Sequence, residues 1–242
     1  MIQSSDGCIP PALLELEMSV LRLRMYHIIE AHRKDPGDDE QGGSQAVVIG
    51  KLLQELLDRM KARSARGIEA LSKIEGEYFS DIAWDTAMTA AHKGEMTPAA
   101  VCFMACARII SAFLPKSTSA ECQSELHRAH QVRKASALLL TASCLIEMCK
   151  AAHATSPTAT QNTANLMKQA SGALSKMQQT TELMLSDGNF DASSQSTLMS
   201  LLSHHRILTH ELACISGDVS TQLKLLLSNN LNVEDVLTMA EN

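Results

Sequence analysis

The stretch that decides the fold spans residues 80–114 and reads SDIAWDTAMTAAHKGEMTPAAVCFMACARIISAFL. Alanines recur at helical spacing in both of its halves, on either side of Gly94. A glycine ends a helix readily, and the cap Thr97 followed by Pro98 at a first helical position begins another. The stretch therefore predicts two helices joined by a tight turn, packed closely through small side chains.

Residues that end or begin helices recur along the rest of the chain. Apolar residues follow helical periodicity between breakers spaced about every 20 to 35 residues, which is typical of antiparallel helices with short loops. No segment alternates with period two for long enough to predict a strand. We expect an all-α, antiparallel multi-helix bundle, and the pattern permits two three-helix units that share a long central helix near 120–153. The lack of a strong repeat signature disfavours a helical-repeat array.

Two helical units are predicted from these breakers. The first covers residues 1–115 and contains an acidic, glycine-rich loop at 35–45, DPGDDEQGGSQ. The second covers residues 116–242. Pro115 follows the second helix of the hairpin and supplies the boundary between the two units.

Composition restricts the classes of function. The 242 residues carry a net charge of −6, which disfavours nucleic acid as a direct partner. Aromatic residues make up only 3%, so we expect a core of aliphatic side chains, alanine and some of the thirteen methionines. The start lacks the pattern of a secretory signal, and the longest apolar runs without charge, 96–107 and 135–146, are shorter than a membrane span.

The seven cysteines are odd in number and irregularly spaced, and most lie within apolar helical pattern. This usage predicts reduced, buried thiols in a cytoplasmic protein.

Candidate catalytic and metal-binding residues lack the required spacing. Ligands of a zinc site on a helix typically lie at i and i+4, and an acidic magnesium site of the terpene-cyclase kind needs a helix and an aromatic cavity. We therefore predict no metal site, no cofactor and no enzymatic activity. The groups weighed in this way are His204, His205, His210 and Glu211; His127 and His130; Cys102 and Cys106; Cys144 and Cys149; and Asp38, Asp39 and Glu40.

Small and apolar residues of the hairpin can instead line a groove for a helix of another protein. The predicted groove walls are Ala87, Ala91, Phe103, Ala107 and Ile110 in the first unit, with Leu174 and Met177 in the second. At the edge, Lys93 and Arg108 would select the charge of the partner. The alternative interpretation is that the same residues are ordinary core.

The alanine and glycine spacing also resembles that of a family. Ala87, Ala90 and Ala91 before Gly94, and Ala99 after it, resemble the first two helices of an MIT domain. A second such unit would lie in 120–215. A tandem of this kind resembles the C-terminal region of the autophagy-initiating serine/threonine kinases. Bundles of the vinculin and talin type are similar at this level.

The resemblance to the kinase region implies binding to a regulatory protein and association with membranes. We therefore expect a non-catalytic interaction module that docks an amphipathic partner segment, in an autophagy or membrane-trafficking assembly. The alternatives are a helical regulatory or ligand-binding domain of a transcription regulator, and a cytoskeletal adaptor bundle.

Overall fold

The computed structural model describes residues 11–34, 44–114, 125–155, 161–186 and 192–218, which form seven α-helices without a strand. The all-α prediction is confirmed. The helices are α1 (Pro11–Lys34), α3 (Gln45–Ala65), α4 (Lys73–His92), α5 (Met96–Phe113), α6 (Glu125–Thr155), α7 (Gln161–Ser186) and α8 (Ala192–Ser216).

Local sequence signals set several of the helix ends. The hydroxyl oxygen of Ser44 accepts a hydrogen bond from the Ala46 backbone N–H and caps α3. Ser72 and Glu75 form a capping box at the start of α4. Gly94 ends α4 with a φ of 78°, and Gly217 follows α8 with a φ of 71°, a region that favours glycine.

The predicted cap of α5 is wrong. The helix begins at Met96, and the Ala99 N–H donates to the carbonyl of Glu95 at 3.1 Å, so helical bonding starts before Thr97. Glu95 occupies the N-cap position without a capping bond from its side chain. Its carboxylate instead accepts a hydrogen bond from the Ser44 hydroxyl, which ties the α4–α5 turn to the start of α3.

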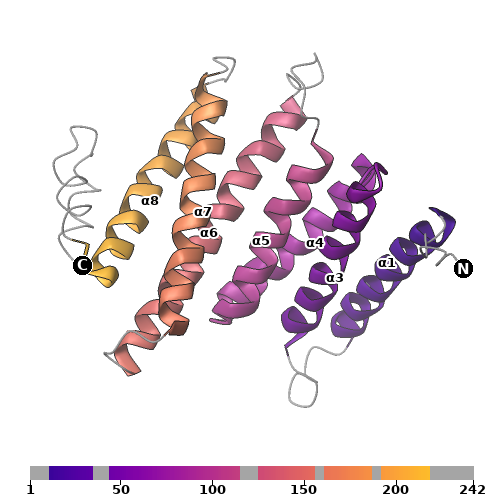
Figure 1. Cartoon of the computed structure of the whole chain (residues 1–242), viewed down its shortest axis with the longest axis horizontal. Helices are drawn as coiled ribbons and strands as arrows, with labels where there is room; N and C mark the ends of the chain where they lie inside the picture. Colours follow the sequence, from indigo (N-terminus) through magenta and orange to yellow (C-terminus); the bar gives the residue numbers. More distant parts are fainter. Residues whose placement is uncertain (1–10, 35–43, 115–124, 156–160, 187–191, 219–242) are drawn as a thin grey trace, which may run out of the picture.

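The helices are stacked in chain order from α1 at one end to α8 at the other (Figure 1). Each helix from α3 onward packs against the next, most extensively α4 on α5, α5 on α6 and α6 on α7. Contacts between alternate helices, α3 with α5 and α6 with α8, divide the stack into two layers. The helices α3, α5 and α7 form one layer and α4, α6 and α8 form the other, while α1 packs mainly on α3.

Successive helices contact their neighbours along the chain, which is consistent with the predicted all-α bundle. One hydrophobic core runs through the stack and includes buried residues of all seven helices. The predicted boundary near 115 falls between α5 and α6, which pack extensively against each other.

Two helices, α5 and α6, are long and apolar enough to cross a membrane when a few charged residues are allowed. About half of each apolar window, 50% in α5 and 56% in α6, is buried within the protein. Core helices of a bundle have the same length and apolar composition, so these two properties do not distinguish a membrane-spanning helix from a buried core helix.

Candidate functional site

Six of the seven predicted groove-wall residues lie in the core. Ala87, Phe103, Ala107, Ile110, Leu174 and Met177 are all at most 3% exposed. The space between the hairpin and the rest of the chain is filled by the protein's own helices, mainly α3 and α6 against α5. In the folded protein these six side chains are therefore buried in its own core and do not line an open groove.

The other three predicted residues are more accessible. Ala91 is half-buried, and Lys93 and Arg108 are exposed. Lys93 lines a surface hollow of about 390 Å³ together with Asp85 and Glu95. Arg108 lies on the exposed side of α5 and lines a different groove.

This second groove, here called the α5–α7 groove, lies in the layer formed by α3, α5 and α7. Its volume is about 260 Å³. Side chains of α3 and α5 form one wall, those of α7 the other, and α6 forms the floor. The lining residues are Gln54, Leu57, Thr97, Ala100, Val101, Met104, Ala105, Arg108, Thr141, Leu145, Met148, Leu166 and Gln169.

The groove exists because α5 and α7 both pack on α6 and hardly touch each other. Ala100 and Ala105 are too small to fill the space between the two helices. Val101 is 41% exposed, and Met104, Met148 and Leu166 are half-buried, so their apolar surfaces remain accessible. The hydroxyl of Thr97 donates to the Met148 sulfur at 3.7 Å, which joins α5 to α6 at one end.

Charge in the groove is confined to one side chain. Among the described residues that line it, Arg108 alone is charged, and glutamines and threonines supply the remaining polar atoms. An apolar surface with a few polar groups at its rim is the usual form of a docking site for a protein segment.

A larger hollow of about 640 Å³ lies in the other layer, between α4, α6 and α8. The Arg133 guanidinium stacks over the Trp84 ring at 5.3 Å and pairs with Asp81, so its charge is already matched. Glu125 and Arg128 also line this hollow. Mixed charges and an arginine held within the protein make it a weaker candidate than the α5–α7 groove.

Three buried cysteines of α5 and α6 are poor nucleophiles. Burial raises the pKa of Cys102 and of Cys106 to about 12, and that of Cys144 to about 11, because the thiolate would be desolvated. Free thiols are present at all five described cysteines. Raised pKa values and burial are typical of cysteines that pack in a core, as the apolar helical pattern around Cys102 and Cys106 predicts.

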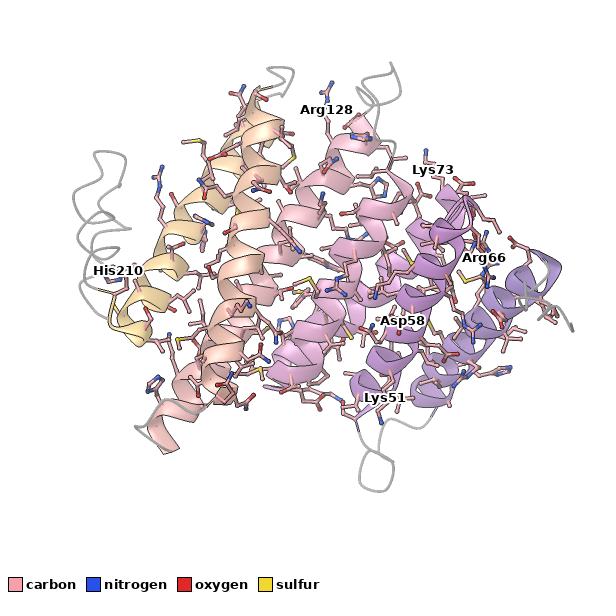
Figure 2. All side chains as sticks on the ribbon, in the orientation of Figure 1. Lys51, Asp58, Arg66, Lys73, Arg128 and His210 are labelled. Carbon is pink, nitrogen blue, oxygen red and sulfur yellow. The ribbon has the colours of Figure 1, made fainter. Side chains whose placement is uncertain are left out.

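The histidine groups are also dispersed. His130 stacks edge-on against Phe113, and His127 contacts Gln131. His210 lies near the end of α8, at the edge of the stack (Figure 2), and its Nδ1 is 3.7 Å from the Cys214 sulfur one turn away. Within the described helices and turns, no three histidine, cysteine or acidic side chains are grouped as metal ligands. Asp38, Asp39 and Glu40 lie outside the described residues.

Sequence reasoning identified Arg108 but missed Val101, Met104, Met148 and Leu166. The signal in α5 was available: Val101 and Met104 are apolar and fall between the alanines that face the core. A helix that is apolar all round does not reveal which side stays open, and that depends on where α7 lies. Comparisons with protein-family models, curated proteins and solved structures find no significant match.

Proposed function

We propose that this protein is a non-catalytic interaction module that docks an amphipathic helix of another protein in the α5–α7 groove. The observation that carries the proposal is an accessible apolar strip, formed by Val101, Met104, Met148 and Leu166, beside a single exposed arginine. The proposal keeps the kind of partner that the sequence predicts and moves the binding site to another face of α5.

The volume of the groove indicates which kind of ligand it can hold. A volume of about 260 Å³ is below the range of sites that enclose a drug-sized ligand, but it accommodates the apolar side chains of one helix face. Methionines adapt to differently shaped side chains, and two of them line this site. The partner therefore contributes two or three apolar anchors at helical spacing, with the rest of its helix outside.

The charge of the groove predicts the charge of the partner residue that lies at its rim. Arg108 is exposed at the rim, and no acidic residue is among the described side chains that line the groove. An acidic residue beside the apolar anchors would pair with Arg108 and fix the direction of the partner helix. The resemblance to the kinase C-terminal region implies a regulatory protein as partner, and autophagy or membrane trafficking remains the proposed setting.

Selection from a displayed library of random peptides tests the proposal. The intact protein should select amphipathic peptides with an acidic residue next to the apolar positions. Val101→Glu should lose these peptides, because a carboxylate in the apolar strip must be desolvated on binding. Arg108→Glu should shift the selected peptides from acidic to basic.

The matched control is Ile74→Glu, which places the same charge on an exposed apolar residue of α4, in the other layer. The Ile74→Glu variant should select the same peptides as the wild-type protein. The proposal is wrong if Val101→Glu and Arg108→Glu select the same peptides as the wild type while circular dichroism shows all three variants folded.

A further inference from the structure

The outward side of α1 carries an apolar stripe with no neighbour in the stack. Leu13, Leu16, Val20 and Leu23 are between 45% and 58% exposed. The opposite side of the same helix holds Met18, Leu21 and Met25, which are at most 1% exposed and face the core. The helix α1 is thus apolar on two opposite sides, although only one is buried by the described chain.

The stripe has a spacing of three, four and three residues, which is the heptad spacing of helix-on-helix packing. This spacing is the same when read in reverse. An antiparallel copy of α1 therefore places Leu13 opposite Leu23 of the other chain and Leu16 opposite Val20. Every apolar side chain of the stripe meets another apolar side chain, as a two-fold symmetric interface requires.

The charged residues of α1 do not oppose such a contact, because they pair with the protein's own helices. Glu15 contacts Arg63 at 2.9 Å, and Glu17 pairs with Arg59. On α1 the basic residues behave alike: Arg22 contacts Glu75, and Arg24 contacts Glu55, both at 3.1 Å. These four pairs hold α1 against α3 and α4 and leave the stripe itself uncharged.

The position of α1 at the end of the stack makes an apolar outer side unusual. A helix at the surface of a protein generally carries polar residues on its solvent side. The outer side of α1 instead carries apolar side chains of the kind that pack between helices, namely Leu13, Leu16, Val20 and Leu23. A standard interface buries roughly 800 Å² per partner over about 20 to 30 residues, and this stripe has four, so a dimer formed through it should be weak.

We propose that a second copy of this protein packs its α1 antiparallel against this stripe and forms a weak two-fold symmetric dimer. The occupant is a copy because the stripe is complementary to itself in spacing and in the absence of charge. The site is separate from the α5–α7 groove, so either proposal can fail without the other.

Analytical ultracentrifugation of the intact protein, from about 1 µM to about 300 µM, tests the dimer. The wild type should shift from monomer to dimer with rising concentration. Leu16→Glu and Leu23→Glu should each weaken the dimer about tenfold or more, because a buried carboxylate lacks a partner there. Leu183→Glu, at an exposed leucine of α7, should behave as the wild type.

A charge-complementation experiment tests the orientation. Leu16→Lys and Val20→Glu should each weaken self-association, whereas an equimolar mixture of the two variants should dimerise again, because antiparallel packing places residue 16 opposite residue 20. A wild type that stays monomeric throughout the range overturns the proposal. Equal dimerisation of Leu16→Glu and wild type, loss of the dimer in Leu183→Glu, or a mixture without recovery overturns it as well.

Discussion

Gly76 allows α4 to approach α5 where the ring of Phe113 lies. A Cβ atom at position 76 would lie 2.1 to 2.8 Å from three atoms of Phe113, including its Cβ, which is too close for any real contact. Phe113 cannot simply rotate away, because its ring is packed edge-on against His130. The absence of a side chain at position 76 therefore sets the distance between two central helices.

We predict that Gly76→Ala lowers the free energy of unfolding by about 1 to 3 kcal/mol, because overpacking outweighs the better helix propensity of alanine. The matched control is Gly172→Ala in α7, where a Cβ meets nothing within 4 Å. This control should raise the free energy of unfolding by up to about 1 kcal/mol. Denaturant titration measures both, and a stabilising Gly76→Ala would contradict the account.

Buried thiols give stability a defined pH dependence. Burial raises the pKa of Cys102 and Cys106 from 9.0 in the unfolded chain to about 12. The folded state therefore keeps a proton that the unfolded state loses, so this contribution is complete below pH 9 and is lost as the pH rises from 9 toward 12.

We predict that each of these two thiols lowers the free energy of unfolding by about 1.4 kcal/mol per pH unit above pH 9. Replacing both cysteines with alanine should flatten the slope correspondingly, although the variant is less stable at neutral pH. Urea titrations between pH 8 and pH 10.5 measure the slope. A slope unaltered by the double replacement would show that the thiols ionise equally in both states.

Single positions differ in how well sequence predicts them. Gly94, Gly217 and Ser44 were predictable because a turn glycine or a helix cap acts through its own backbone. Gly76 was not, because it depends on the position of Phe113, 37 residues away in the sequence. Long-range neighbours also determine which of the apolar residues of α5 remain accessible.

The helix α1 packs extensively against one other described helix only. Its extensive packing within the described chain is with α3. Arg63 of α3 is 5% exposed, contacts Glu15 of α1 at 2.9 Å and donates from Nε to the Glu69 carbonyl at 2.9 Å. One guanidinium thus joins α1 to α3 and to the α3–α4 loop.

We predict that Arg63→Ala lowers the free energy of local opening of α1 by about 2 to 3 kcal/mol, because a nearly buried charge-assisted contact and its packing are lost. Hydrogen exchange of the α1 amides, compared with those of α5, measures this effect. Lys61→Ala is the control, since Lys61 is exposed on the same helix and contacts Asp58. Equal exchange of α1 in both variants would contradict the role of Arg63.

The periodicity of apolar residues predicted where the helices lie. It predicted only in part which side of each helix is buried. In α1 the apolar residues Leu16, Leu21 and Met25 all fit helical periodicity, yet the structure exposes Leu16 and buries the other two. A helix with apolar residues on opposite sides does not specify which side faces the core. The arrangement of the neighbouring helices decides it.

The molecule as a whole is a two-layer stack whose continuous core runs from α1 to α8. The sequence predicted helices and short turns correctly, yet it placed the binding groove where the stack is densest. Small residues allow close packing, and close packing fills the space that a groove would need. An open groove remains instead where α5 and α7 are both supported by α6 without touching extensively.

Methionine methyl groups provide the most direct test of docking in the α5–α7 groove. Methyl NMR spectra of the protein labelled at methionine should be recorded with and without an amphipathic peptide selected by the intact chain. The account predicts shifts at Met104 and Met148, with none at the buried Met18 and Met25 of α1. Binding of the peptide that leaves Met104 and Met148 unchanged would contradict the proposed site.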